Sequence, residues 1–203
     1  MKYTKVGASK ALKRIADSNG VFRPRDLARY GIPRTYLQRW VQDGLLERVG
    51  WGLYRLTNRA VSEHQTLIEV ATRVPNGVVC LLSALQFHGL GTQLPSQVWI
   101  AIDRKAWKPE VRDLPIRIVR FSGHSLTEGV QVHRLDGVKV SVYEPAKTVA
   151  DCFRYRNKIG LDVAIEALRD CRDQRRCSID EIWRYAKIDR VANVMHPYLE
   201  ALG

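Results

Sequence analysis

The chain has 203 residues, 45% of them hydrophobic and 27% charged, a composition typical of a folded globular protein. No apolar run approaches the roughly 20 residues that a membrane-spanning helix needs, and the first ten residues lack the apolar stretch of a secretory signal, so we expect a cytoplasmic protein. The formal net charge of +12 favours a polyanionic partner.

The positive charge is concentrated at the N-terminal end. Residues 1–60 hold thirteen Lys and Arg against four Asp and Glu, whereas residues 61–203 hold twenty against seventeen. A chain with this asymmetry is expected to place its N-terminal part against a polyanion. A polar stretch after residue 56 predicts a linker, so we expect one domain over 1–58 and a second over 59–203.

The N-terminal elements predict a winged helix-turn-helix. Apolar residues at helical spacing indicate helices over 9–18, 24–30 and 33–43, the last two with Leu27, Ala28, Leu37, Trp40 and Val41 facing inward. Two strand-like runs, 45–49 and 53–56, surround the turn Gly50-Trp51-Gly52 and indicate a β-hairpin. Three helices followed by a hairpin form the winged-helix pattern.

The predicted third helix has the residue types that read DNA. Arg and Gln can each make two hydrogen bonds to a base edge in the major groove, and the outer face of this helix carries both. Arg23 and Arg25 precede the second helix, where free backbone N–H groups would help them to hold phosphates. A solvated face or a protein-docking module is the alternative interpretation. The predicted DNA contacts are Arg23, Arg25, Arg34, Thr35, Tyr36, Gln38, Arg39, Arg48, Trp51 and Arg55.

The second half predicts a mixed α/β domain with a small antiparallel sheet and C-terminal helices, which makes the whole chain α+β. Strand patterns cover 78–82, 98–102, 116–121, 130–135 and 138–143, and Asp136-Gly137 predicts a two-residue hairpin turn. Helices are predicted over 62–73, 83–88, 145–157 and 161–171, after the capping box Ser178–Glu181, and over 189–202 with a kink or break at Pro197.

Two charged groups in the second domain have open interpretations. Lys147, Asp151 and Arg154 share a predicted helix face and form either a polar surface used against a partner or an intrahelical ion pair worth a few tenths of a kcal/mol. The ion pair is the favoured reading. Arg172, Arg175 and Arg176 form either a solvated face or a second patch that follows DNA.

The remaining reactive residue types predict no catalytic or metal site. The four cysteines form no C-x-x-C pair and are expected to be reduced thiols, mostly buried. Trp99, Trp107 and Trp183 are expected to pack in the core or between domains. No phosphate-binding glycine loop or nucleophile elbow is present, so we predict a non-enzymatic protein without cofactor or metal. A ligand-sensing winged-helix transcription factor and a winged-helix-guided nuclease are the alternatives.

Several motifs resemble the AbiEi antitoxins of type IV toxin–antitoxin systems, which act in abortive infection by phage. In the first domain the motifs are GIPRTYL at 31–37, GLLERV at 44–49 and GLY at 52–54. In the second they are LSAL at 82–85, HGL at 88–90 and YEPAKTVAD at 143–151. The resemblance spans about residues 5–175.

The resemblance implies a repressor and antitoxin. Its first domain would bind double-stranded DNA at repeats upstream of its own operon, and its second would counter a toxin with a nucleotidyltransferase fold. Whether antitoxin and toxin touch stays open. A small module offers few base contacts, so we expect a monomer or weak dimer in solution and several copies on the DNA.

Overall fold

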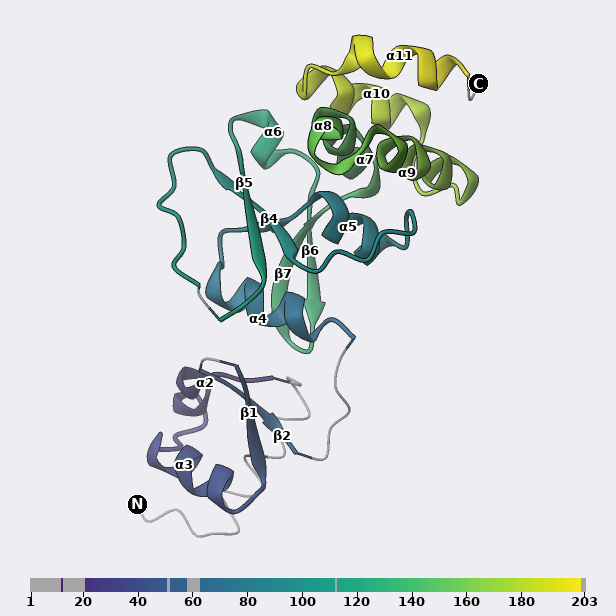
Figure 1. The fold of residues 1–203 in the computed structure, drawn as a ribbon. Coiled ribbons are helices and arrows are strands. Elements are labelled where there is room, and N and C mark those ends of the chain that lie inside the picture. Colours follow the sequence, from purple (N-terminus) through teal and green to yellow (C-terminus); the bar gives the residue numbers. More distant parts are fainter. Residues whose placement is uncertain (1–11, 13–20, 51, 58–62, 112, 202–203) are drawn as a thin grey trace. The chain divides into compact units, whose positions relative to one another are not determined.

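The structure, a computed structural model, describes residues 12, 21–50, 52–57, 63–111 and 113–201. The chain forms two compact units (Figure 1). The first comprises residues 1–72 together with the hairpin tip 134–139, and the second comprises residues 73–133 and 140–203.

The described residues from Val21 onward in the first unit form two short helices, a hairpin and most of a further helix. In chain order they are α2 (Pro24–Ala28), α3 (Thr35–Gln42), β1 (Leu46–Gly50), β2 (Leu53–Leu56) and α4 (Gln65–Arg73). Two helices followed by a hairpin occur in the order expected for residues 24–56. The expected helix over 9–18 lies outside the described residues except for Leu12, which is helical and buried.

The core beneath α3 explains how that helix is oriented. Leu37 and Trp40 are both 5% exposed and pack inward. Two predicted core positions are wrong, because Ala28 and Val41 are exposed. Val41 lies at the edge of the buried stripe, about 40° around the helix axis from Leu37 and about 100° from Trp40, and is 37% exposed. The buried members of this core are Leu12, Phe22, Leu27, Ile32, Leu37, Trp40 and Leu46.

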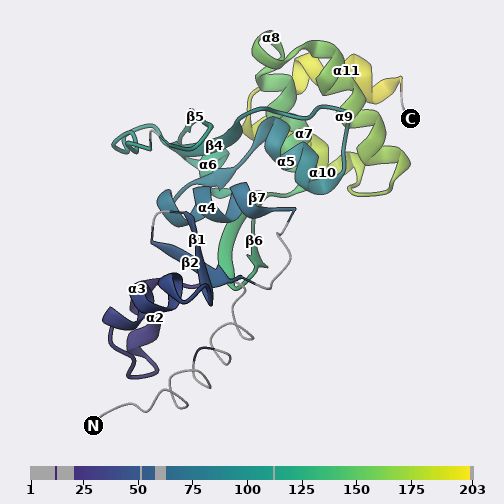
Figure 2. The same cartoon turned by 60° about the horizontal axis from the view of Figure 1, so that its bottom comes forward.

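The β1–β2 hairpin is antiparallel and gains a third short segment. Phe22 N–H donates to the carbonyl of Tyr54 at 2.9 Å, and Tyr54 N–H donates back at 3.0 Å. Figure 2 shows α3 beside β1, which it contacts. The hairpin therefore fixes one side of α3 and leaves the other side to solvent.

A second small core ties α4 to the hairpin of the first unit. Val21, Leu53 and Ile68 are buried together, and Leu135 and Val138 pack against them from the hairpin tip. Ile68 is 0% exposed. Residues beyond position 58 therefore complete the packing of the first unit.

The large sheet is mixed, which corrects the predicted small antiparallel sheet of the second half. Its strand order is β5-β4-β3-β7-β6, in which β3 is antiparallel to β4 while the pairs β4–β5 and β3–β7 are parallel. The strands are β3 (Val78–Val79), β4 (Val98–Asp103), β5 (Ile116–Phe121), β6 (Val130–Leu135) and β7 (Val138–Tyr143). The predicted strand over 78–82 ends early because a helix begins at Leu81.

The turn between β6 and β7 confirms its sequence signal. Asp136 has φ +46° and Gly137 has φ +80°, so both central residues occupy the left-handed region that a two-residue hairpin of this kind requires. Asn, Asp and Gly adopt that region most readily.

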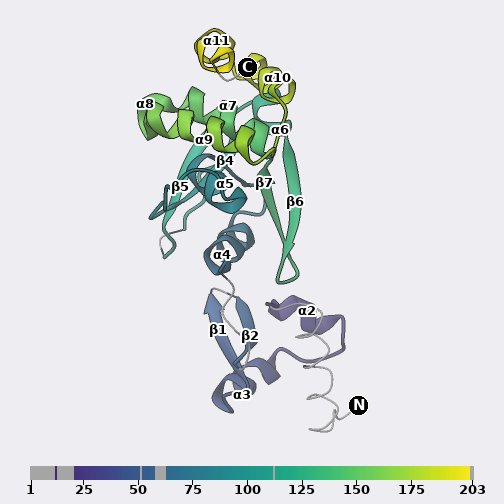
Figure 3. The same ribbon diagram turned by 90° about the vertical axis from the view of Figure 1, so that its right-hand side faces the viewer.

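Seven helices of the described residues belong to the second unit in addition to the end of α4. They are α5 (Leu81–His88), α6 (His124–Thr127), α7 (Pro145–Arg154), α8 (Arg156–Ile159), α9 (Leu161–Asp173), α10 (Ile179–Ile188) and α11 (Ala192–Glu200). Figure 3 shows α7, α9, α10 and α11 gathered at one end of the sheet. Helix α7 contacts α5, α9 and α10, so it lies at the centre of this layer.

Local details of these helices both confirm and correct the sequence reading. The predicted capping box is present, since Glu181 N–H donates to Ser178 Oγ at 3.2 Å. Helix α11 is continuous through Pro197, so of the predicted kink or break the break is absent. The helix expected over 145–157 is interrupted at Tyr155, which separates α7 from α8.

One cysteine prediction is wrong. Cys171 and Cys177 form a disulfide, with their Cα atoms 6.1 Å apart, while Cys80 and Cys152 are free and buried as expected. Within the described part of the chain, no helix is both long and apolar enough to cross a bilayer.

Candidate functional site

The outward face of α3 is polar and solvent-exposed. Arg34 precedes the helix as its N-cap residue, and Thr35, Gln38 and Arg39 follow it on the side opposite Leu37 and Trp40. All four polar residues are exposed, whereas Tyr36 is half-buried with its ring centroid 5.5 Å from that of Trp40. The structure therefore brings four predicted contacts together and places Tyr36 mainly in packing.

The two arginines at the start of α2 differ in exposure. Arg25 is exposed, while Arg23 is half-buried and its backbone N–H donates to Asp26 Oδ2 at 2.8 Å. Burial lowers the pKa of Arg23, and the guanidinium of Arg25 lowers it further. Since Asp26 takes an N–H at this end of the helix, the free N–H groups expected to assist phosphate binding are partly used.

Of the two hairpin arginines that were predicted to contact DNA, Arg48 is exposed and Arg55 is buried. Arg48 is exposed, and its Nε donates to the carbonyl of Gly50 at 3.2 Å. Arg55 is only 8% exposed, and its Nε donates to Glu47 Oε1 at 2.6 Å. Arg55 holds the two strands together, which corrects its predicted place on the outer surface. Trp51 lies outside the described residues.

The charged residues of α7 that were considered as a polar surface of the second domain are mostly buried. Lys147 and Asp151 are both 0% exposed and ion-paired, and Lys147 Nζ also donates to Asp189 Oδ2 at 3.1 Å. Arg154, partly exposed, completes the set by donating to Asp189 Oδ1 at 3.3 Å. Lys147 and Asp151 form the intrahelical ion pair that the sequence favoured. The alternative of a polar surface is wrong, because both side chains are buried. The few tenths of a kcal/mol expected for an exposed pair do not apply to a buried network. Asp189, which follows α10, was not found from the sequence.

The surroundings of this network are strongly desolvated. Lys147 Nζ lies 4.8 Å from the ring centroid of Tyr143 and 5.0 Å from that of Phe121. Burial raises the pKa of Asp151 well above its usual range, and the nearby Asp189 raises it further against the opposing effect of Lys147. Among the described residues, Asp151 Oδ2 has no hydrogen-bond partner. The network therefore fixes α7 against the end of α10.

The basic cluster near the disulfide is exposed. Arg169, Arg172, Arg175 and Arg176 all face solvent, and Arg172 Nε lies 3.1 Å from Asp173 Oδ1. The loop closed by the disulfide reaches the end of α5, where Gln174 Nε2 donates to the carbonyl of Gly89 at 3.1 Å. The loop therefore has a structural contact, and its role toward DNA stays a prediction.

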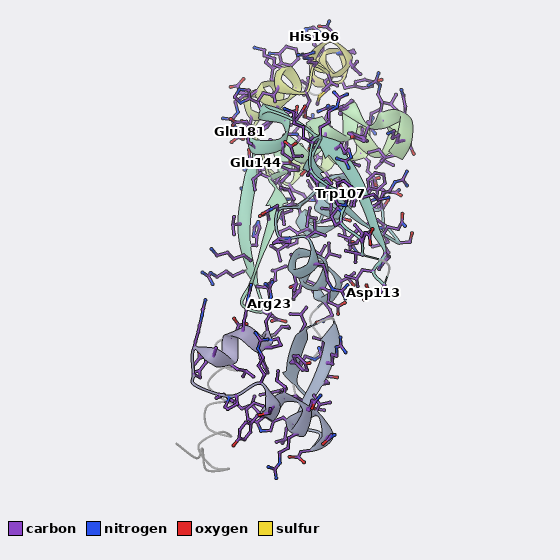
Figure 4. The ribbon with its side chains drawn as sticks, turned by 90° about the vertical axis from the view of Figure 1, so that its left-hand side faces the viewer. Arg23, Trp107, Asp113, Glu144, Glu181 and His196 are labelled. Carbon is purple, nitrogen blue, oxygen red and sulfur yellow. A yellow bond between two sulfur atoms is a disulfide. The ribbon has the colours of Figure 1, made fainter. Side chains whose placement is uncertain are left out.

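One exposed residue differs from its prediction. Trp107, expected in packing, is 89% exposed on the connection between β4 and β5 (Figure 4). Trp99 is buried as expected, and Trp183 is half-buried against the core of the second unit. The run of Lys and Arg around Trp107 was the available signal. No group of three metal-ligating side chains occurs in the part of the chain that the structure describes.

A helix that directs long polar side chains outward beside a β-hairpin is the arrangement typical of nucleic-acid-binding modules. Residues 10–57 match the family model described as a transcriptional regulator, AbiEi antitoxin, which confirms the resemblance over this part of the chain. The matched residues include α2, α3 and the hairpin.

The fold of most of the chain has a solved counterpart. The crystal structure of the RV2827C protein from Mycobacterium tuberculosis aligns with a TM-score of 0.59 and 17% sequence identity, over 89% of this chain and 71% of that chain. At this identity the similarity concerns the fold alone. No curated protein matches the chain.

Proposed function

We propose that this chain is a DNA-binding transcriptional repressor and the antitoxin of a type IV toxin–antitoxin system. Its first unit, a winged helix-turn-helix, lays α3 into the major groove of its own operator. Its second unit counters a toxin with a nucleotidyltransferase fold. The match of residues 10–57 to the AbiEi regulators supports the class of function.

The exposed face of α3 is the observation that carries the DNA-binding part. Arg34, Gln38 and Arg39 project from a helix whose other side is anchored by buried residues, so these side chains can enter a groove without unfolding anything. Arg and Gln at such positions make two hydrogen bonds to guanine and adenine respectively. Arg25 and Arg48, both exposed, are the candidates for flanking phosphates.

A double variant tests this proposal. Arg34→Ala with Arg39→Ala should weaken binding of the full chain to the DNA upstream of its gene by roughly 2–5 kcal/mol in gel-shift titrations. Lys158→Ala with Lys187→Ala is the charge-matched control, because both lysines are exposed in the second unit. Equal affinity of the two double variants would refute the role of α3.

Salt provides a second readout of the same interface. If the complex neutralises six phosphates, log K should fall with log salt at a slope of roughly −5. The Arg34→Ala/Arg39→Ala variant should make this slope shallower if both residues also lie near phosphates. An affinity that does not change with salt would contradict the proposal.

The antitoxin part is tested by growth. Co-expression of the chain with the gene next to its own should restore growth that the neighbouring gene alone arrests. The full chain with Arg34→Ala and Arg39→Ala should lose operator binding and still rescue growth, because its second unit is unchanged. Loss of rescue in that variant would overturn the proposed division of labour.

A further inference from the structure

Trp107 is a large apolar side chain in an unusual setting. It is 89% exposed on the connection from Asp103 to Ile116 that joins β4 to β5, and this connection extends away from the sheet (Figures 1 and 2). Because the Trp107 indole is hardly packed against its own protein, it is accessible to a ligand.

The backbone that carries Trp107 is held in place. Arg120 NH1 donates to the carbonyls of Asp103, Arg104 and Ala106 at 3.2, 2.8 and 2.9 Å. Asp103 Oδ1 also accepts the backbone N–H of Lys105 at 2.7 Å. The turn before Trp107 is therefore ordered by a strand side chain, which lowers the entropy lost when the indole binds.

The segment around Trp107 has an excess of positive charge. Residues 103–121 hold six Lys and Arg against three Asp and Glu, whereas the rest of 61–203 holds fourteen of each. Asp113 is already engaged by two hydrogen bonds of 2.7 Å from Arg73. Lys105, Lys108 and Arg117 are exposed, and among the described residues none of them is ion-paired.

A pocket of about 430 Å³ is lined by residues of this connection and of β5, and its basic lining residues are Lys108, Arg117 and Arg120. The guanidinium of Arg117 is placed over the ring of Trp99, 4.2 Å from its centroid. The apolar lining residues are Pro109, Val111, Ile116 and Ile118.

We propose that Trp107 and the basic side chains beside it bind single-stranded nucleic acid. The indole stacks on an unpaired base, and Lys105, Lys108 and Arg117 contact the phosphates on either side. Bases in a duplex already stack on one another, so only an unpaired base offers its face to the indole without a cost of unstacking. This site is independent of α3 and of the function proposed above.

The test uses the full chain with Arg34→Ala and Arg39→Ala, so that α3 contributes little. Fluorescence anisotropy follows binding of labelled oligouridylate and oligothymidylate of about 12 nucleotides, a length within known single-strand site sizes, and of a DNA duplex of equal length. Adding Trp107→Ala should weaken binding of the single strands about tenfold, while Trp107→Phe keeps most of the affinity because it keeps a ring.

Matched variants separate stacking from charge. Leu94→Ala removes another exposed apolar side chain, 82% exposed in an uncharged segment, and should change nothing. Lys105→Gln with Lys108→Gln should make the slope of log K against log salt shallower by about 1, and Lys158→Gln with Lys187→Gln should not. A loss confined to one of the two strands would identify which of the two polymers the site prefers.

Two results would overturn the proposal. If Trp107→Ala leaves both single strands bound with unchanged affinity, the surface serves a different class of partner, such as a protein. If the same variant weakens only the duplex, the indole does not stack on unpaired bases. Because Trp107 is exposed, its replacement should leave the unfolding temperature unchanged, so loss of folding does not obscure either result.

Discussion

Replacing Lys147 by Met should destabilise the second unit by about 3–5 kcal/mol at neutral pH. Met has a similar length but no charge, so the substitution leaves Asp151 and Asp189 buried without the ammonium that joins them. Among the described residues, Asp189 then keeps its contact with Arg154 at 3.3 Å, and Asp151 keeps no ion-paired cation. Removing one partner of a buried pair is far costlier than removing an exposed one, because the remaining charge stays desolvated.

Asp151→Asn should cost less than half as much. The amide is neutral and close in shape to the carboxyl, and Lys147 keeps its contact of 3.1 Å with Asp189. The substitution also removes a carboxylate whose pKa is raised by burial and by Asp189. The two variants therefore separate loss of the cation from loss of one of its two anions.

The raised pKa of Asp151 fixes the sign of a pH effect. Between the unfolded pKa and the higher folded pKa, the folded protein binds more protons than the unfolded chain. The contribution of Asp151 to stability is therefore full below the unfolded pKa and is lost as the pH rises through the folded pKa. In Asp151→Asn this part of the pH dependence should be absent, so its stability should fall less than that of the parent chain as the pH rises.

Hydrogen exchange measured on peptides is the appropriate assay, because the chain has two units and need not unfold in one step. In Lys147→Met, amides of α7 and α10 should exchange faster, while those of α3 serve as the internal control. An unchanged exchange rate in α7, or equal losses from Lys147→Met and Asp151→Asn, would refute the reasoning.

Three further predictions concern single packing elements. Arg55→Ala should lower stability by about 1–2 kcal/mol in urea unfolding yet leave operator affinity of the folded protein unchanged, and a loss of affinity would return Arg55 to the interface. Ile68→Ala should destabilise the first unit by about 2–5 kcal/mol, measured by exchange in β2, where no effect would exclude α4 from that core. Cys171→Ser with Cys177→Ser should lower stability by about 2 kcal/mol, and an equal effect of dithiothreitol on the parent chain checks that the disulfide is responsible.

The elements that could be predicted are those whose bonds close within a few residues. The turn at Asp136-Gly137 and the capping box at Ser178 satisfy backbone groups locally, so their residue types mark them in the sequence. No local residue pattern in the sequence indicates the pairing of β3 with β7. It joins Val79 to Val142, and the sequence between them does not state which strands become neighbours or in which direction.

The candidate DNA-binding face was predictable because a helix repeats every 3.6 residues and one side of α3 is apolar. Arg55 was misplaced although a signal existed. Leu53 and Arg55 lie two residues apart on β2, and alternation places them on the same face of the strand, which the buried Leu53 identifies as the inner face.

The buried network and the exposed basic surfaces differ in their charge balance, and this difference indicates what each does. Inside the second unit, Lys147 and Arg154 are matched by Asp151 and Asp189, and the last of these lies 42 residues after Lys147, so no local pattern could supply it. A charge set that is neutral within the protein needs no ligand, and its role is to fix two helices. In the segments that contain α3 and Trp107, arginines and lysines outnumber carboxylates, by thirteen to four over residues 1–60 and by six to three over residues 103–121. Charge left unmatched on an ordered surface favours an anionic partner, which is why we assign the functional roles to these two surfaces and a structural role to the network.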